Sequence, residues 1–174
     1  MNNEKNITVK SYLYALVSAV ILLIADQFTK HLAVVNLKGS EDIILIDGVL
    51  RFHYLENKGA AFGIMQNKQI FFAVVAVVII ALVAFIYKKI PHTGRYFLLR
   101  FCSVLVVAGA VGNVIDRLLY NYVVDFIYFE LIDFPVFNVA DIYVVVACFL
   151  FAYAILFYYK DEELEIFSFK KGKK

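Results

Sequence analysis

IFFAVVAVVIIALVAFIY, residues 70–87, contains no charged side chain and only the phenol of Tyr87 as a polar group. A helix needs about 20 apolar residues to cross the hydrocarbon of a bilayer, and this stretch is close to that length. Its many Val and Ile residues are also typical of strands. A bilayer tolerates no unpaired sheet edge, however, so an uninterrupted apolar run of this length predicts a membrane-spanning helix.

Three further segments are predominantly apolar and of similar length or longer, at about residues 12–37, 97–117 and 139–159, and the first of them is interrupted by polar residues at 26–31. Of the 174 residues, 63% are hydrophobic and only 18% are charged, and the charges lie mainly between and beyond the apolar segments. A soluble domain of this size would need more polar surface. The sequence therefore predicts an all-α membrane protein, a single domain over residues 1–174 built as a four-transmembrane-helix bundle.

Basic residues indicate which side of the membrane each connection occupies. Lys and Arg gather at the front end, in the second connection and in the tail, whereas the first and third connections, at about 38–69 and 118–138, carry balancing or dominant acids. Cytoplasmic loops are enriched in Lys and Arg. We therefore expect both termini in the cytoplasm and the two longer connections outside, with these basic groups inside: Lys5, Lys10, Lys88, Lys89, Arg95, Arg100, Lys160, Lys170, Lys171, Lys173 and Lys174.

The front end has one alternative interpretation, a cleaved secretory signal, because Lys10 precedes an apolar stretch. That stretch runs into Asp26 and the polar residues after it, and not into the small residues that suit a signal peptidase. Its removal would also leave an odd number of spans. An uncleaved anchor fits better.

The two outer connections have different characters. In the first, residues 43–46 and 49–55 are strand-like and flank Asp47-Gly48, a favoured turn dipeptide, so we expect a small hairpin or sheet on the outer leaflet. In the third, residues 118–134 mix aromatic residues with acids, which suits a segment lying in the membrane interface. Only the Lys-rich tail has the composition of a disordered segment.

Five polar patches interrupt the apolar sequence, at residues 26–30, 57–63, 112–117, 124–126 and 137–141. An ionisable side chain costs roughly 2.5–3.5 kcal/mol at the centre of a membrane helix, so it seldom persists there without a function. Most of the polar groups are carboxylates and carboxamides. The patches therefore favour acid–base chemistry at a membrane.

Three of the patches are open to a structural interpretation, and the one that begins at Asn57 would by itself be an ordinary loop. Asp26 and Lys30 lie four residues apart, so they share a helix face and can neutralise each other as a brace. Asn113, Asp116 and Arg117 also share one face, and Arg117 would keep its neighbour Asp116 ionised, which suits a brace better than a proton shuttle. Before them, Ala108, Gly109, Ala110 and Gly112 form a small-residue surface for close helix packing.

Asp125 and Asp141 differ because each lies among apolar residues with no adjacent base. They flank the same outer connection, so both can lie at one depth near the outer surface. Two carboxyls within a few Å in a dry site share one proton, and such a pair can activate water and protonate a carbonyl, as in an aspartic peptidase. Unrelated interfacial carboxylates are the alternative. Asn138, three residues before Asp141, would lie on the same side of a helix that has begun there.

Other site chemistries lack their signatures. Cys102 and Cys148 lie in apolar runs, so we expect reduced packing residues and no disulfide or metal pair. Metal-ligand, nucleophilic-serine and lipidation motifs are missing, and no basic stripe with interleaved aromatics indicates nucleic acid. We expect no cofactor.

Taken together, the five patches resemble those of the bacterial lipoprotein signal peptidases, the type II signal peptidase family, in order and over nearly the whole chain. The motifs are Asn-x-Gly-Ala-Ala-Phe from Asn57, Gly-Asn-x-x-Asp-Arg from Gly112, Val-Val-Asp-Phe around Asp125 and Phe-Asn-x-Ala-Asp ending at Asp141. Each is weak alone and the set is specific. Two departures are Ile142, where the family often has Ser, and Ala108-Gly109, where it often has Gly-Gly.

The resemblance implies an intramembrane aspartic endopeptidase of the bacterial cytoplasmic membrane. It would cut a prolipoprotein just before its diacylglyceryl-modified cysteine, without metal or cofactor, and globomycin-type peptides would inhibit it. Its partners would be the lipidated substrate and membrane lipids, with no obligate protein partner. The implied catalytic pair is Asp125 and Asp141, with Asp116 as the less favoured catalytic carboxylate, and supporting or substrate-binding roles fall on Asp26, Lys30, Asn57, Gly59, Asn113, Asp116, Arg117, Asn138 and Ala140.

Two other classes of function stay open on the sequence. A small proton-coupled transporter could use intramembrane acids as a relay. Acids gathered near one surface make a poor path through the membrane, and a flux assay would separate the two functions. A non-catalytic membrane scaffold would tolerate Asp125→Asn and Asp141→Asn without loss of function.

Overall fold

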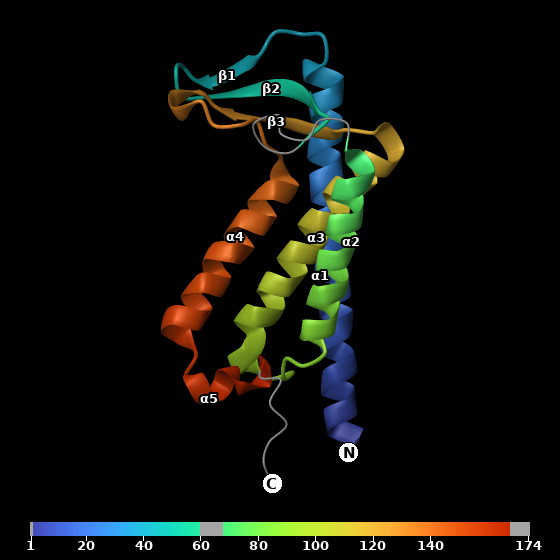
Figure 1. Ribbon diagram of the computed structural model, residues 1–174, viewed down its shortest axis with the longest axis vertical. Helices are drawn as coiled ribbons and strands as arrows, with labels where there is room; N and C mark the ends of the chain where they lie inside the picture. The colour runs from blue at the N-terminus through green and yellow to red at the C-terminus, as the bar shows by residue number, and fades with distance from the viewer. Residues whose placement is uncertain (1, 60–67, 168–174) are drawn as a thin grey trace.

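The computed structural model describes residues 2–59 and 68–167, and its long helices run side by side (Figure 1). They are α1 (Asn2–Leu37), α2 (Gln69–Tyr87), α3 (Phe97–Tyr120) and α4 (Val139–Tyr153). Within these described ranges, four helical segments are long and apolar enough to cross a membrane: Ile7–Leu37, Gln69–Tyr87, Gly94–Tyr120 and Val139–Tyr158. Many of the large apolar residues along them are exposed, as expected of lipid-facing side chains in a membrane bundle.

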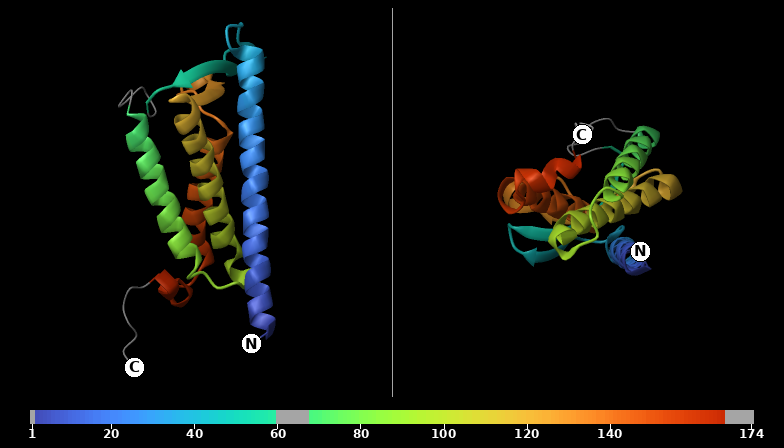
Figure 2. Two further views of the ribbon diagram at one scale, coloured as in Figure 1. Left: turned by 90° about the vertical axis from the view of Figure 1, so that its right-hand side faces the viewer. Right: turned by 90° about the horizontal axis from the view of Figure 1, so that it is seen from below.

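Helix α3 is the centre of the bundle, because α1, α2 and α4 all pack against it (Figure 2). The predicted small-residue surface makes this possible. A Cβ on Gly109 would clash with the Ala140 carbonyl of α4, and one on Gly112 would clash with the Asp26 carboxylate of α1. The helices therefore approach α3 more closely than any larger residue would permit.

A three-stranded antiparallel sheet covers one end of the bundle. Strands β1 (Ile43–Ile46) and β2 (Leu50–Asn57) form the predicted hairpin, and β3 (Val123–Phe129) adds to the other side of β2. The segment expected to lie in the interface is thus partly a strand of the sheet. Its register opposes Leu55 to Asp125, so β3 is held over the helix ends by main-chain pairing.

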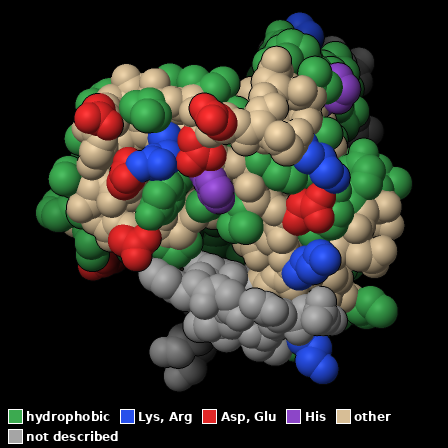
Figure 3. All heavy atoms as spheres, turned by 90° about the horizontal axis from the view of Figure 1, so that it is seen from above, with side chains coloured by type: hydrophobic (Ala, Val, Ile, Leu, Met, Phe, Trp, Pro, Cys, Tyr) green, Lys and Arg blue, Asp and Glu red, His purple; other side chains and the backbone are tan. Residues whose placement is uncertain are grey.

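Seen from the sheet end, acidic and basic side chains lie close to one another (Figure 3). Arg51 forms ion pairs with Glu130 and, at 3.5 Å, with Asp42. Lys38 contacts Glu56 at 2.8 Å. These pairs are partly or fully exposed, so each adds little stability, about 0–1 kcal/mol, and they keep the sheet surface polar.

The opposite end is closed by α5 (Asp161–Leu164), which follows a π-helical turn, Ala154–Tyr158. Arg95 donates to both Glu163 carboxylate oxygens, at 2.8 and 2.9 Å, and its guanidinium lies 4.1 Å from the centre of the Tyr158 ring. The Lys-rich tail after residue 167 lies outside the described residues. Both cysteines are free, but only Cys102 is buried, so the expected packing role is wrong for Cys148.

The predicted fold class, a bundle of four membrane-spanning helices with a small sheet, is confirmed. This arrangement positions the elements that carry the predicted site residues. It brings β2, β3 and the beginning of α4 together over the sheet-proximal half of α3.

Candidate active site

Two carboxylates from different elements, Asp125 and Asp141, line one cavity of about 400 Å³ beneath the sheet. We call them the pocket carboxylates. Asp125 is on β3, and Asp141 is in the first turn of α4. The sequence analysis predicted that both could lie at one depth in the membrane. In the structure they line the same cavity, together with Asn57, Gly59, Arg117, Phe134, Pro135, Val136, Phe137, Ile142 and Val145.

Asn138 links the pocket carboxylates. Its Nδ2 donates to Asp125 Oδ1 at 2.6 Å, and its main-chain N–H donates to Asp141 Oδ2 at 3.1 Å. In return, Asn138 Oδ1 accepts the Asp141 N–H at 3.1 Å, which completes a capping box at the start of α4. Since Asn138 is fully buried, it fixes both carboxylates in a single geometry.

Two further carboxamides complete the first layer of contacts. Asn57 Nδ2 donates to Asp125 Oδ2 at 2.7 Å, and Asn113 Nδ2 donates to Asp141 Oδ1 at 2.8 Å. Asn113 Oδ1 also accepts from Asn138 Nδ2 at 3.1 Å. Every oxygen of the two carboxylates therefore accepts an N–H, and these neutral donors orient the acids without supplying a counter-charge.

The predicted second patch is described only as far as Gly59, and residues 60–63 lie outside the described residues. Gly59 is buried, and its N–H donates to Asn57 Oδ1 at 2.9 Å. This bond holds the Asn57 carboxamide so that its Nδ2 points to Asp125.

Burial raises the pKa of Asp125 to about 7, and the negative charge of Asp141 acts in the same direction. Hydrogen bonds from Asn57 and Asn138, and the charge of Lys30, oppose this rise. Asp125 can therefore carry a proton near neutral pH, which an exposed aspartic acid cannot. A protonated acid beside a second carboxylate is the arrangement needed for general acid–base catalysis.

Behind the pocket lies an ion triad formed by Asp26, Lys30 and Asp116. Lys30 Nζ lies 3.0 Å from both Asp26 Oδ2 and Asp116 Oδ2, and all three residues are buried. Lys30 also donates to Asn113 Oδ1 at 2.9 Å. The predicted neutralisation of Asp26 by Lys30 is present, and Asp116 shares the same ammonium group.

The ion triad also fixes the main chain next to each pocket carboxylate. Asp26 Oδ1 accepts the Ala140 N–H at 3.0 Å, and Asp116 Oδ2 accepts the Val124 N–H at 3.1 Å. Ala140 and Val124 each precede a pocket carboxylate by one position. The triad is therefore the brace that the Asp26–Lys30 spacing suggested, and Ala140 takes part through its main chain.

Asp116 does not use its neighbour Arg117 as its counter-ion, contrary to the sequence interpretation; its ion pair is with Lys30. Arg117 turns toward the pocket instead, where its guanidinium lies 5.4 Å from the centre of the Phe72 ring and donates to Asn113 O at 3.2 Å. Its buried Nε has no hydrogen-bond partner within the described ranges. One donor of Arg117 thus stays available beside the pocket.

Sequence reasoning missed three contributors. Gln27 donates to Asp26 Oδ2 at 3.1 Å and to Asp116 Oδ1 at 3.0 Å, which bridges the two acids of the triad. Its position between Asp26 and Lys30 in the first polar patch was the available signal. Pro135 and Val136 line the pocket from the turn before α4, and no motif marks them.

Comparisons with known proteins agree on one family. The family model described as signal peptidase (SPase) II matches residues 18–157. A lipoprotein signal peptidase from Clostridium tetani is 42% identical over 155 residues, which cover 86% of this chain and 96% of that protein. One from Streptococcus thermophilus is 39% identical and covers 83% of this chain and 92% of that protein.

Solved structures agree with the sequence relatives. A bacterial membrane enzyme determined by the in meso method at 2.3 Å resolution matches with a TM-score of 0.72 and 29% identity, over 92% of this chain and 94% of that one. A second such enzyme, determined at 1.9 Å, matches with a TM-score of 0.70 and 31% identity, over 83% and 93% of the two chains. The family match, the relatives and the bundle together show that the chain belongs to the signal peptidase II family, the lipoprotein signal peptidases.

Proposed function

We propose that the protein is an aspartic endopeptidase that removes the signal peptide from diacylglyceryl-modified prolipoproteins, cutting just before the lipidated cysteine. One observation carries this proposal. Asp125 and Asp141, from separate elements, line a single cavity and are joined by hydrogen bonds through Asn138.

In hydrolysis, one of the two acids acts as the general base and the other as the general acid. The ionised carboxylate removes a proton from a water molecule, whose oxygen attacks the carbonyl carbon of the scissile bond. The protonated acid gives its proton to the carbonyl oxygen. The carboxyl that took the proton from water then gives it to the nitrogen of the tetrahedral intermediate, and the C–N bond breaks to release the amine of the lipidated cysteine. One hydroxyl of the intermediate returns its proton to the other carboxylate, so the signal peptide leaves as a carboxylic acid and both acids regain their starting protonation states.

Asp125 suits the role of the acid that begins the reaction protonated, since its pKa of about 7 leaves a large protonated fraction at neutral pH. Asp141 then acts as the base. Its two oxygens are oriented by Asn113 and by the Asn138 main chain, so the lone pair facing the cavity is held in place.

The walls of the cavity fit an amphiphilic substrate. Phe134, Pro135 and Val136 make one apolar side, and Ile142 and Val145 make another. Ile142 is 38% and Val145 51% exposed, so this second side continues onto the outer surface of α4. A signal helix and its acyl chains would reach the acids from the lipid along this surface. Ile142, in place of the family's common Ser, adds apolar area there.

Polar groups at the cavity suit the substrate main chain. Arg117 Nε is a buried donor with no partner among the described residues, and the Asn57 carboxamide faces the same cavity. A peptide carbonyl or the lipid ester would satisfy Arg117 Nε, which removes the cost of leaving a charged donor unpaired.

The active site would lie near the outer surface of the cytoplasmic membrane. The sheet end carries the site, and the start of α1 and the α2–α3 connection lie at the opposite end (Figure 1). These segments and the first turn of α3 contain Lys10, Lys88, Lys89, Arg95 and Arg100. The bias of basic residues toward the cytoplasm supports this orientation, with both termini inside.

The decisive experiment incubates purified enzyme with a diacylglyceryl-modified precursor and with its unlipidated counterpart, and locates the cut by mass spectrometry. We expect cleavage of the lipidated precursor alone, on the amino side of the modified cysteine. Asp125→Asn and Asp141→Asn should each lower the rate at least about 10³-fold, because each removes one partner of the acid–base pair.

Asp47→Asn, in the exposed hairpin turn, is the matched control and should cleave normally. Asp116→Asn should retain cleavage with a lower thermal stability, since Asp116 lies in the ion triad. Near-normal turnover in both pocket variants would exclude the proposed pair. Complete loss in Asp116→Asn, with the fold intact, would give Asp116 the catalytic role instead.

A further inference from the structure

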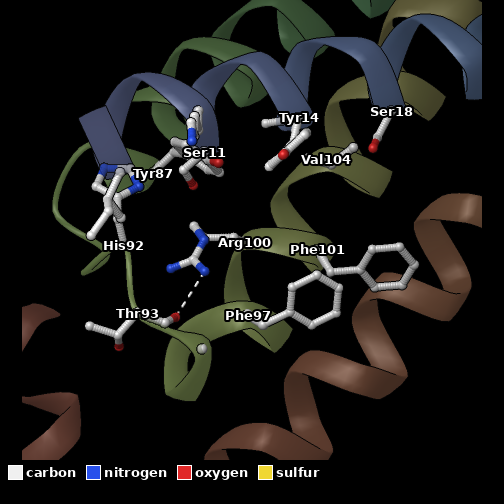
Figure 4. A pocket seen from close by; sticks show the side chains of 14 residues that line it. Ser11, Tyr14, Ser18, Tyr87, His92, Thr93, Phe97, Arg100, Phe101 and Val104 are labelled. Carbon is white, nitrogen blue, oxygen red and sulfur yellow. Dashed lines mark hydrogen bonds between the residues drawn. The ribbon is translucent and has the colours of Figure 1, made fainter. Parts of the chain in front are cut away.

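A second cavity is lined by residues from the first half of α1, the α2–α3 connection and the first turns of α3, segments at the end of the bundle opposite the sheet (Figure 1). Its volume is about 340 Å³, and it lies between α1, the α2–α3 connection and the first turns of α3. In Figure 4, Arg100 projects into it from α3, with Ser11, Tyr14 and Ser18 approaching from α1. The proposed catalytic function makes no use of this cavity.

One part of the cavity is cationic. Lys10 and Arg100 both line it, and none of the described residues that line it is acidic. Arg100 donates to the carbonyls of Pro91 and, at 2.9 Å, Thr93, which orients its guanidinium. A guanidinium has five N–H donors, so these two contacts leave others to face an anion.

His92 adds a neutral hydrogen-bonding group to the same part. Burial lowers its pKa, and the charge of Arg100 lowers it further, so the imidazole is neutral at pH 7. Its Nδ1 is buried and has no partner among the described residues. The ring is held by Tyr12 and Tyr87, whose ring centres lie 5.1 and 6.3 Å from its own.

The remaining part is apolar. Phe97 and Phe101 stack with their ring centres 5.9 Å apart, and Val104 and Ala15 lie beside them along the cavity. Phe97 is 61% exposed, so this wall opens onto the lipid-facing surface of the bundle. Figure 4 shows the two Phe rings on the other side of Arg100 from His92 and Thr93.

We propose that this cavity binds an anionic diacyl phospholipid, with its phosphate between Lys10, Arg100 and His92 and one acyl chain along Phe97 and Phe101. The cationic part of the cavity lies next to its apolar wall, just as the phosphate of a phospholipid lies next to its acyl chains. The depth also fits, because α3 begins at Phe97 and the Arg100 guanidinium reaches back to the main chain of the α2–α3 connection, at the end of the bundle. Basic pockets between membrane helices on the cytoplasmic side are favourable for anionic headgroups.

The test measures which lipid the purified protein retains. The protein is mixed in detergent with equal amounts of phosphatidylglycerol and phosphatidylcholine of identical acyl chains, and bound lipid is counted by native mass spectrometry. We expect phosphatidylglycerol to be preferred about 30-fold, which corresponds to about 2 kcal/mol from the two cations of the site. The double variant Lys10→Gln/Arg100→Gln should lose this preference.

The charge-matched control is Lys88→Gln/Lys89→Gln, at the same end but outside the cavity, and it should keep the preference. Ser18→Leu fills the apolar part with both cations intact and should reduce retention of the lipid several-fold. Lys10→Gln alone keeps the Arg100 contacts to the connection, so it tests the site if the double variant unfolds.

In the last experiment, inorganic phosphate at about 10 mM is added as a competitor. It should leave the bound phosphatidylglycerol in place, because phosphate makes no contact with the apolar wall. Displacement by phosphate would identify a simple anion site and overturn the lipid assignment. Equal retention of both lipids by the unmodified protein, or equal loss in the charge-matched control, would also overturn it.

Discussion

At the scale of single residues, Asp125 combines deep burial with two amide donors, and these act on its pKa in opposite directions. Burial and the Asp141 charge raise the pKa to about 7, while the Asn57 and Asn138 hydrogen bonds lower it by favouring the carboxylate. The acid needs its proton for the proposed reaction. Activity should therefore fall as the pH rises through about 7.

Asn57→Ala tests this reasoning. It removes a 2.7 Å hydrogen bond to Asp125 Oδ2, so the carboxylate is less stabilised and the pKa rises further. We expect the alkaline limb of the pH–rate profile to move about one pH unit higher, since a hydrogen bond to a charged group contributes about 1.5–3 kcal/mol. Asn36→Ala, on the exposed surface of α1, should leave the limb unchanged. A limb that stayed in place or moved to lower pH in Asn57→Ala would contradict the assignment.

Lys30 differs from an exposed lysine because it is buried between two acids. It is 3% exposed and neutralises two buried acids, so Lys30→Met leaves Asp26 and Asp116 buried without a counter-charge. We expect a loss of about 3–5 kcal/mol in stability, measured by thermal unfolding in detergent. Lys38→Met is the matched control, because its pair with Glu56 is exposed and contributes at most about 1 kcal/mol. Equal stability of the two variants would exclude the brace.

At the scale of elements, contact between α3 and α4 depends on a glycine. In Gly109→Ala the new Cβ would clash with the Ala140 main-chain carbonyl, and a main chain moves less readily than a side-chain end. We expect a loss of about 1–3 kcal/mol, or about 2–4 °C in Tm for each kcal/mol. The rate of cleavage should fall as well, because a shift of the main chain at Ala140 would also displace the next residue, Asp141.

Gly94→Ala provides the control for that change. A Cβ on Gly94 meets nothing within 4 Å, so this variant should unfold at the temperature of the unmodified protein. If the Gly109 and Gly94 variants had the same Tm and activity, close α3–α4 packing would not be what positions Asp141.

The sequence predicted the strands whose pattern and turn lie within one short segment, and it did not predict the strand that pairs with a distant segment. The hairpin of β1 and β2 could be recognised because its turn, Asp47-Gly48, lies between two apolar runs. Strand β3 was missed because its first four residues, including Asp125, are all buried, so it shows no alternation of polar and apolar residues. Its partner β2 lies far away in the sequence, as the Leu55–Asp125 pairing shows, and no local pattern encodes that register.

At the scale of the whole molecule, hydropathy could predict the helical bundle because a bilayer admits so few solutions. The polar residues of the site could also be predicted from the sequence, because polar residues are rare within the apolar segments. Their partners could not be assigned this way. That Lys30 reaches Asp116 as well as Asp26 depends on how α1 and α3 pack, which the sequence does not encode locally.

The orientation of the molecule leads to the last prediction. Four spans return the chain to its starting side, and the basic residues of the front end and of the second connection both favour the cytoplasm. Green fluorescent protein folds and fluoresces in the cytoplasm, whereas alkaline phosphatase is active only outside it. Fusions after residue 89 and after residue 174 should therefore give fluorescence, and a fusion after residue 58 should give phosphatase activity. The reverse pattern would place the pocket carboxylates on the cytoplasmic side, where no exported precursor presents its cleavage site, and would remove the basis for the proposed reaction.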